Sequence, residues 1–268
     1  PIVGDLRYVL PELNELLATE FAPHMPSLAD WWVELDKIKA DYPLGYVKTD
    51  DGLGSPQYVL ERISALTGPD AFYVAGVGQH QMWGAHYIQQ ESPRHFVSSA
   101  GLGTMGYGVP AGMGAKVAHP ESTVRIIDGD GCFQMTNQEL VTCAQNNIPV
   151  KVAIINNSSL GMVRQWQTLF YNERYSNTDL KDGHGTVRIP DFVKLGDAYG
   201  CATFRCERDE DVDATIKAAL EINDRPVVID FTVSPHALVW PMVPAGVSND
   251  KIWIAKNTSP EFDREGEN

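Results

Sequence analysis

The sequence lacks the features that mark a membrane-bound, secreted or nucleic-acid-binding protein. No apolar run approaches the roughly 20 residues that a membrane-spanning helix needs, and no signal peptide is visible. Basic residues are scarce, since 21 Lys and Arg stand against 35 Asp and Glu, for a formal net charge of −14. This balance argues against a basic surface for nucleic acid or for an anionic membrane. An anionic ligand would have to be bound locally, by backbone N–H groups and a metal ion.

Cysteine is also rare, and its four positions are Cys132, Cys143, Cys201 and Cys206. No pair has C-x-x-C spacing, and no histidine stands at zinc-ligand spacing to any of them. We therefore expect buried, reduced thiols in a cytoplasmic protein.

A chain of 268 residues, 43% of them hydrophobic, is long enough for one large globular domain, or for one domain and part of a second. It opens with Pro1 and has no initiator methionine, so we interpret it as a fragment whose N-terminal part is missing or lies on another chain. Residues 1–54 indicate the tail of a preceding domain and a linker. Within them, Pro1 to Glu20 predicts the end of a strand, a turn at Gly4-Asp5 and a helix with leucines on one face, and a second helix is predicted from Leu28 to Lys39.

From Ser55 to residue 235, short apolar runs alternate with helical segments. The predicted strands are Phe72–Val77, Phe96–Ser98, Val124–Ile127, Val150–Ile155, Thr203–Phe204 and Val227–Phe231. The predicted helices are Pro56–Leu66, Gln79–Ile88, Gly106–Ala118, Asn137–Gln145, Gly161–Phe170, Asp191–Tyr199 and Asp209–Ile222. This alternation predicts an α/β fold, with a doubly wound, mostly parallel six-stranded sheet and helices on both faces. Ligands of such sheets bind beyond the carboxyl ends of the strands.

A Gly-Asp-Gly turn at Gly129 to Gly131 directly follows a buried strand, and the next strand ends in Asn156-Asn157. One β-α-β crossover spans this segment, and such crossovers join nearby parallel strands. We therefore expect the Asp130 carboxylate and the Asn157 amide oxygen at the same edge of the sheet. With a loop carbonyl and two phosphate oxygens they would form an octahedral Mg²⁺ site. The two glycines would let the backbone approach the phosphates.

Other interpretations of these motifs fit less well. A calcium-binding EF-hand loop over Asp128 to Glu139 would have Phe133 where it needs glycine, and a strand precedes it in place of a helix. A plain turn would explain Gly-Asp-Gly but not the Asn-Asn pair. The segment Gly101 to Gly106 matches the G-x-G-x-x-G pattern of nicotinamide-binding folds, yet the strand before it is short and polar, and the expected acidic residue comes late, at Asp128.

The spacing from Gly-Asp-Gly to Asn-Asn resembles the signature of thiamine-diphosphate enzymes. Four longer stretches narrow the resemblance to the catalytic subunit of the acetohydroxyacid (acetolactate) synthases: Val77–Trp83, Gly101–Gly108, Leu160–Gln167 and Trp240–Val243. The resemblance runs from about Ser55 to Asp250, and Pro1 to Glu20 resembles the end of that family's FAD-associated middle domain.

The resemblance implies a set of cofactor-binding residues. Asp130 and Asn157 would be the side-chain ligands of Mg²⁺, and Ser159 would contribute its backbone oxygen. Residues expected to offer N–H groups to the diphosphate, or to approach it, are Gln79, His80, Gly131, Cys132, Leu160 and Gly161. The other residues expected at the cofactor are Val77, Gly78, Gly103, Met105, Gly129, Met162 and Val163.

Four of these expectations concern catalysis, at Gln79, His80, Met105 and Trp166. Met105 would lie under the cofactor and force its bent shape, while Gly103 would supply a carbonyl to the aminopyrimidine. The helical spacing of Trp166 is by itself typical of a core stripe; the resemblance implies that it shapes the pocket for the second 2-oxo acid and favours 2-oxobutyrate. Residues 236–268 would form a C-terminal lid and tail, in which Leu238 to Val247 would be the lid over the active site.

The implied reaction condenses pyruvate with pyruvate or 2-oxobutyrate, with loss of CO₂, to 2-acetolactate or 2-aceto-2-hydroxybutyrate in branched-chain amino acid biosynthesis. The implied cofactors are thiamine diphosphate, Mg²⁺ and FAD, the last bound mainly by the preceding domain. The implied partners are the N-terminal portion of the same enzyme, further copies in a homodimer or tetramer, and a regulatory small subunit. Because the family's catalytic glutamate lies in the N-terminal domain, the chain alone is expected to be inactive.

Three alternatives stay open. Another thiamine-diphosphate enzyme (pyruvate oxidase, glyoxylate carboligase or a 2-oxo acid decarboxylase) would keep both short motifs but need not keep Gly161 to Trp166. A nicotinamide dehydrogenase would not require Mg²⁺. A non-catalytic binding or assembly module would not need Asp130.

Overall fold

The computed structural model describes residues 1–22, 25–180 and 189–259. The chain divides into two units, Pro1–Gly45 and Tyr46–Asn268. None of the helices in these described ranges is long and apolar enough to cross a membrane. All four cysteines are free and buried, which confirms the expected reduced thiols.

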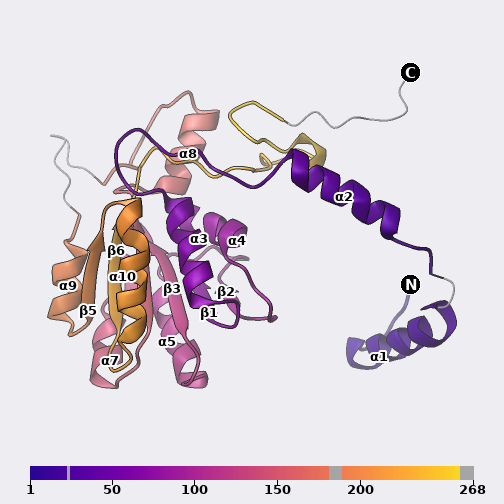
Figure 1. The fold of residues 1–268 in the computed structure, drawn as a ribbon, viewed down its shortest axis with the longest axis horizontal. Coiled ribbons are helices and arrows are strands. Elements are labelled where there is room, and N and C mark those ends of the chain that lie inside the picture. Colours follow the sequence, from indigo (N-terminus) through magenta and orange to yellow (C-terminus); the bar gives the residue numbers. More distant parts are fainter. Residues whose placement is uncertain (23–24, 181–188, 260–268) are drawn as a thin grey trace. The chain divides into compact units, whose positions relative to one another are not determined.

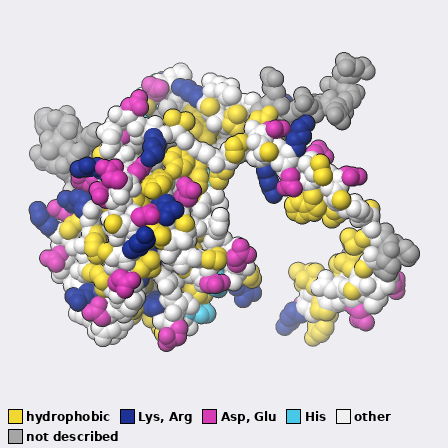
Figure 2. All heavy atoms as spheres, viewed as in Figure 1, with side chains coloured by type: hydrophobic (Ala, Val, Ile, Leu, Met, Phe, Trp, Pro, Cys, Tyr) yellow, Lys and Arg dark blue, Asp and Glu magenta, His cyan; other side chains and the backbone are white. Residues whose placement is uncertain are grey.

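The first unit consists of two helices. Helix α1 (Leu6–Leu16) is capped by Asp5, whose Oδ1 accepts from the Arg7 backbone N–H at 2.9 Å, and it continues into a π-helical turn up to Phe21. Helix α2 spans Ala29–Asp41. The strand predicted at the start of the chain is wrong, because residues 1–5 pair with no other strand. Neither helix has a buried residue, and Figure 2 shows apolar side chains at their surfaces.

The second unit is built on a six-stranded, all-parallel sheet, as the sequence predicts (Figure 1). Its strands are β1 (Phe72–Ala75), β2 (Phe96–Ser98), β3 (Val124–Gly129), β4 (Lys151–Asn156), β5 (Ala202–Cys206) and β6 (Val227–Thr232). They lie in the order β2-β1-β3-β4-β6-β5. Every residue of β3 and β4 is buried, as expected for central strands that are covered on both faces.

Helices cover both faces of the sheet, each over its own hydrophobic cluster. On one face lie α3 (Pro56–Thr67), α4 (Gln79–Tyr87) and α10 (Asp209–Glu221). On the other lie α5 (Gly108–Ala118), α6 (Asp130–Thr136), α7 (Glu139–Gln145) and α9 (Phe192–Ala198). Helix α8 (Gly161–Phe170) follows β4 and lies beyond the ends of the strands in Figure 1.

The crossover from β3 to β4 differs from the prediction of one helix that begins near Asn137. Helix α6 begins at Asp130, directly after the strand, and a second helix, α7, follows it. Asn137 lies at the break, where its Nδ2 donates to the Phe133 carbonyl at 3.1 Å and its Oδ1 accepts from the Tyr199 hydroxyl at 2.9 Å. The side chain thus bonds a carbonyl at the end of α6, which explains why one continuous helix does not form.

The sheet has a topological switch point between β1 and β3. These strands are hydrogen-bonded neighbours, but α4 leaves β1 on one face of the sheet and α6 leaves β3 on the other. Loops that diverge in this way leave a crevice at the carboxyl ends of the strands, where open α/β sheets bind ligands.

Two buried cationic side chains lie side by side near the amino ends of β3 and β4, opposite the carboxyl ends of the strands. Arg125 and Lys151 are register partners on β3 and β4 and are 0% and 2% exposed. Arg125 Nε donates to Thr67 Oγ1 at 3.0 Å, but its Nη1 and Nη2 have no hydrogen-bond partner among the described residues. Lys151 Nζ donates to the carbonyl of Ile222. Burial, and then the charge of Arg125, lowers the pKa of Lys151 to about 8.

We expect Arg125→Met to raise the free energy of unfolding at pH 7 by about 1 kcal/mol, because it removes a buried guanidinium whose Nη1 and Nη2 have no hydrogen-bond partner among the described residues. In the parent, the Lys151 pKa rises from about 8 when folded to 10.5 when unfolded, so the unfolded state binds more protons in this window and stability increases with pH. The variant should show a smaller increase, since losing the neighbouring charge returns the Lys151 pKa toward 10.5. Urea denaturation from pH 7 to 10.5 measures both effects.

The control is Arg62→Met, which removes a guanidinium that is paired with Asp213 at 2.6 Å. This variant should keep the pH dependence of the parent and gain no stability. A less stable Arg125→Met protein at pH 7 would show that the buried guanidinium is compensated after all.

Candidate functional site

A cavity of about 230 Å³ opens at the switch point. Its walls come from the segments after β1, β3 and β4 and from the loop before α5. All the residues that the sequence predicts at the cofactor line this cavity, and Trp83 and Ile155 join them. Trp166 does not; it lies further along α8 and is 41% exposed.

Three helices begin at the cavity wall. The first residues of α4, α6 and α8 are Gln79, Asp130 and Gly161, and each of them lines the cavity. The backbone N–H groups of a helix's first turn have no partner within the helix, and the helix dipole places partial positive charge there. The arrangement therefore suits an anionic group such as a diphosphate.

The carboxylate of Asp130 and the amide oxygen of Asn157 meet at one backbone donor. The N–H of Ser159 lies 3.2 Å from Asp130 Oδ2 and 3.1 Å from Asn157 Oδ1. The N–H of Gly131 donates to the other Asp130 oxygen at 2.8 Å. The expectation that these two side chains meet at the carboxyl edge of the sheet is therefore confirmed.

The donor set at this point fits a hard divalent cation. Asp130 is 2% exposed, and among the described groups that act on its pKa there is no cationic side chain. Burial raises the pKa of Asp130 to about 7, although the N–H groups of Gly131 and Ser159 act against the shift. A cation beside the carboxylate would stabilise its ionised form. Mg²⁺ prefers such oxygens and completes its shell with phosphate and water.

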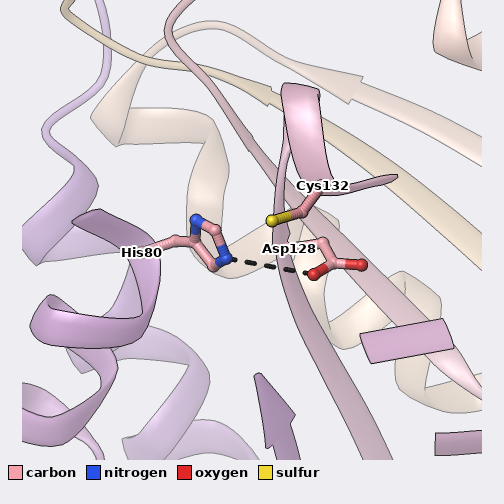
Figure 3. A group of neighbouring side chains, drawn as sticks. All are labelled: His80, Asp128 and Cys132. Carbon is pink, nitrogen blue, oxygen red and sulfur yellow. Dashed lines mark ion pairs between the residues drawn. The ribbon is translucent and has the colours of Figure 1, made fainter. Parts of the chain in front are cut away.

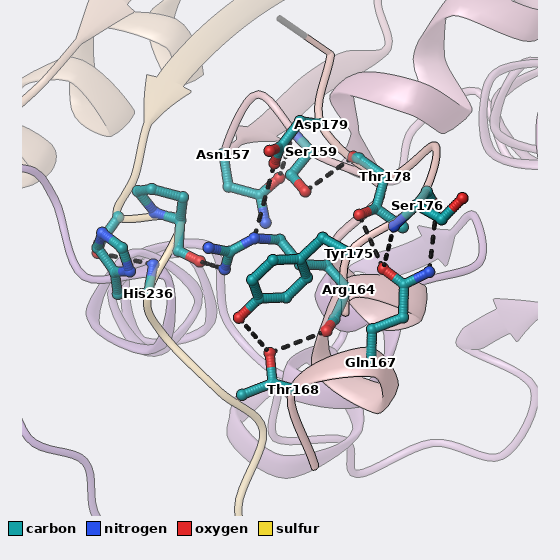
Figure 4. Close-up of polar contacts among 12 residues, drawn as sticks. Asn157, Ser159, Arg164, Gln167, Thr168, Tyr175, Ser176, Thr178, Asp179 and His236 are labelled. Carbon is teal, nitrogen blue, oxygen red and sulfur yellow. Dashed lines mark hydrogen bonds and ion pairs between the residues drawn. The ribbon is translucent and has the colours of Figure 1, made fainter. Parts of the chain in front are cut away.

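A segment that follows α8 holds Ser159 in place (Figure 4). The Leu160 N–H and the Ser159 hydroxyl both donate to the Thr178 carbonyl, at 2.8 and 3.0 Å. Thr178 is itself held by α8, because its hydroxyl donates a hydrogen bond to Gln167 Oε1 at 3.0 Å. Ser158, the residue before, has a φ of 56°, so the backbone turns sharply there. These contacts fix the loop whose carbonyl is the third predicted Mg²⁺ ligand.

His80, Asp128 and Cys132 form a buried cluster beside the cavity (Figure 3). His80 Nε2 lies 3.9 Å from Asp128 Oδ1. Burial lowers the pKa of His80 to about 3 and raises those of Asp128 and Cys132 to about 8 and 11, so it favours the neutral form of each group. The thiol donates to the Val77 carbonyl at 2.9 Å. A neutral cluster with its sulfur in a hydrogen bond is a poor cation site, and we assign no metal to it.

Two residues at the site were not predicted as site residues from the sequence. Asp128 ends an apolar strand, and its carboxylate is wedged against the backbone of Gly76 and Gly108, where an added Cβ would lie 2.0 and 2.6 Å from it. Gln165 is a buried polar residue on α8, and its amide contacts Gln79 and Val239. Because glutamine is polar, the sequence pattern assigns this position to the exposed face of a helix. Only the folded structure reveals that the side chain is buried.

The predicted lid segment, Leu238 to Val247, packs partly into the second unit. Val239 is fully buried, Met242 is 9% exposed and forms a bridge with Trp253, and the Trp240–Pro241 peptide bond is cis. Whether the segment acts as a lid stays a prediction.

Comparison with known proteins assigns the family. Residues 76–231 match the model of the C-terminal TPP-binding domain of thiamine pyrophosphate enzymes. The chain therefore belongs to the thiamine pyrophosphate enzymes and carries their C-terminal cofactor-binding domain, in agreement with the fold and with the resemblance of its motifs.

The similar curated proteins are acetolactate synthases, so the chain is a homologue of the large subunit of that enzyme. It is 58% identical over 267 residues to an acetolactate synthase of Mycobacterium avium and 57% identical over 263 residues to the acetolactate synthase large subunit of Mycobacterium tuberculosis. It is 52% identical over 263 residues to the large subunit of Corynebacterium glutamicum. These alignments cover 98–100% of this chain but only 42–43% of each relative.

We expect Gly161→Ala to lower the free energy of unfolding by about 1–3 kcal/mol, because the new methyl group overpacks a buried contact. A Cβ at Gly161 would lie 2.1 Å from Gln79 Oε1 and 2.6 Å from Asn157 Nδ2, and so would separate these two amides. Gly114→Ala, in the exposed part of α5, meets nothing within 4 Å and should instead raise stability by about 0.5–1 kcal/mol through helix propensity. Urea denaturation of both variants measures the difference; equal effects would contradict the close packing at Gly161.

Proposed function

We propose that this chain is the cofactor-binding portion of an acetolactate synthase, which condenses pyruvate with pyruvate or 2-oxobutyrate and releases CO₂. The observation that carries the proposal is the meeting of Asp130 and Asn157 at the Ser159 N–H, beside three helix N-termini. The identity of 52–58% to acetolactate synthases over nearly the whole chain supports the choice among thiamine-diphosphate enzymes. The products would be 2-acetolactate or 2-aceto-2-hydroxybutyrate.

Asp130 and Asn157 would hold Mg²⁺ through their side chains, and Ser159 through its carbonyl. The diphosphate would lie against the N–H groups of the loops after β1, β3 and β4, where Gly129 and Gly131 line the cavity. Thiamine diphosphate, when bound, supplies the electron sink that the decarboxylation of a 2-oxo acid needs. The chain's own contribution is to bind, orient and shield this group.

Met105 and Gly103 would form the wall that sets the shape of the bound cofactor. Both line the cavity, and Met105 Cε lies about 3.4 Å from the place where a Cβ of Gly131 would stand. Gly103 has a φ of 75°, a backbone conformation that favours glycine. We propose that this turn directs the Gly103 carbonyl toward the aminopyrimidine. Gln79 and His80 would approach the diphosphate at the start of α4.

Trp166 would act at the second substrate and not at the cofactor. It is partly exposed on α8, one turn beyond Met162 and Val163, which line the cavity. A large ring at this distance could contact a 2-oxo acid that approaches the bound cofactor from outside.

The active enzyme would need more than this chain, which spans less than half the length of its curated relatives. We propose that the preceding portion supplies most of the FAD site and the catalytic glutamate, the latter across the interface of a homodimer or tetramer. A regulatory small subunit is a further candidate partner, and the cytoplasm is the expected compartment.

Asp130→Ala in the full-length enzyme should abolish Mg²⁺-dependent binding of thiamine diphosphate and lower acetolactate formation by more than about 100-fold, since loss of an outer-shell partner alone costs about 10–100-fold. Calorimetric titration with the cofactor and a colorimetric assay for acetolactate measure the two effects.

Glu121→Ala, at an exposed carboxylate outside the cavity, is the control and should match the parent. Unchanged activity in Asp130→Ala would favour a non-catalytic module. Acetaldehyde or acetyl phosphate as the product of the parent enzyme would instead indicate another member of the thiamine-diphosphate group.

The 268 residues by themselves should form no acetolactate from pyruvate, even with Mg²⁺ and thiamine diphosphate at saturation, because no glutamate of the described ranges lines the cavity. Product analysis over several hours, with the full-length enzyme as the positive control, measures this. Turnover by the isolated chain would show that its own residues complete the site.

A further inference from the structure

Three buried amide side chains form a continuous chain of hydrogen bonds behind the proposed metal site. Asn157 Nδ2 donates to Gln79 Oε1 at 3.2 Å, and Gln79 Nε2 donates to Gln165 Oε1 at 2.8 Å. The three residues are 8%, 5% and 2% exposed. They come from the loop after β4, from the start of α4 and from the middle of α8.

Backbone groups fix the direction of this chain at both ends. The Val239 N–H donates to Gln165 Oε1 at 2.9 Å, and Gln165 Nε2 donates to the Val239 carbonyl at 3.2 Å. The Ala237 carbonyl accepts from Gln79 Nε2 at 3.2 Å. At the other end, the Ser159 N–H donates to Asn157 Oδ1. A backbone N–H only donates and a carbonyl only accepts, so the oxygen and nitrogen of each amide can occupy only one arrangement.

Both ends of the buried Gln165 amide have polar contacts. Its oxygen accepts from two donors, and its nitrogen contacts both the Val239 carbonyl and Met242 Sδ, the latter at 3.4 Å. A buried amide is costly unless it is hydrogen-bonded, and a satisfied network is rigid. Gln165 can therefore hold its neighbours in one orientation.

We propose that Gln165 is a positioning residue that, through Gln79, keeps the amide oxygen of Asn157 turned toward the metal site. Without the acceptor on Gln165, Gln79 Nε2 keeps only its longer bond to the Ala237 carbonyl among those described, so the Gln79 amide can rotate more easily and present its nitrogen to Asn157. Asn157 would then turn its own nitrogen toward the cation, and an amide nitrogen is not a ligand for Mg²⁺. This inference rests on the proposed function, in which Asn157 binds Mg²⁺.

The same contacts link the metal site to the chain after β6. Ala237 and Val239 belong to the segment that follows the last strand, and their hydrogen bonds to Gln79 and Gln165 connect this segment to the proposed ligand Asn157. The structure thus assigns to this segment a part in metal binding that does not require it to touch the cofactor.

The test compares Gln165→Met with Gln165→Glu in the full-length enzyme, by calorimetric titration of Mg²⁺ at saturating thiamine diphosphate. Methionine keeps the length but loses the acceptor, so Mg²⁺ should bind about 10–100-fold more weakly. The carboxylate of the glutamate variant still accepts from Gln79 and Val239, so its affinity should stay within about threefold of the parent. A structural role alone would make the buried carboxylate at least as harmful as the methionine.

Combining Gln165→Met with Asn157→Asp tests whether the effect of Gln165 on Mg²⁺ binding depends on the orientation of the Asn157 amide. In Asn157→Asp both side-chain oxygens can face the cation, so the orientation of the amide no longer matters. Adding Gln165→Met there should change the Mg²⁺ affinity by less than about threefold. If Gln165→Met does not fold, Gln165→Asn, which is too short to reach Gln79, replaces it with the same expected loss.

Gln138→Met, at an exposed position between α6 and α7, is the matched control and should bind Mg²⁺ like the parent. The inference is overturned if Gln165→Met binds Mg²⁺ normally, if the methionine and glutamate variants are equally impaired, or if the loss persists in the Asn157→Asp background. Asp130→Ala separates this result from the proposed function. If Asp130→Ala retains the parent's Mg²⁺ affinity, the proposed metal site is wrong. If it loses that affinity while Gln165→Met does not, the metal site stands and only the positioning role of Gln165 is wrong.

Discussion

The site depends on two polar side chains, a buried carboxylate and a buried amide. Two adjacent central strands bring them to the same backbone N–H group. Because β3 and β4 are adjacent and parallel, the residues that follow them lie at the same edge of the sheet, and both Asp130 and Asn157 reach the Ser159 N–H. A carboxylate this deep is expensive to ionise, and the N–H groups around it offset only part of the cost. A cation beside the carboxylate, as proposed for Mg²⁺, would offset the remaining cost.

The surroundings of this carboxylate are shaped by missing side chains as much as by those present. At Gly161 an added methyl group would strike the amides of Gln79 and Asn157, and at Gly129 it would lie 2.8 Å from the ring of His80. The backbone therefore packs directly against functional groups on both sides of the cavity. Dense packing of this kind leaves the polar side chains little freedom to reorient, which is what a preorganised binding site requires.

Much of the fold was predictable because the second unit follows simple rules. Its apolar runs are short, β-branched and separated by helical periods, and each of them forms a strand of the parallel sheet. The spacing from Asp130 to Asn157 likewise follows from one crossover. The break between α6 and α7 was not predictable, since Asn137 interrupts the helix with side-chain hydrogen bonds to Phe133 and to Tyr199, which is distant in sequence. Gln165 was missed for a related reason, because its polarity is satisfied by a segment more than 70 residues away in sequence.

The switch point also determines how the two helical layers respond to a ligand. Helix α4 packs over one hydrophobic cluster and α6 over the other, and the cavity lies between their first turns. A diphosphate and its cation would contact both helical layers at once, and so connect them at the carboxyl ends of the strands. Since binding to the folded state adds directly to its stability, thermal melting with ligand should be a single, sharper event in which neither layer loosens before the other.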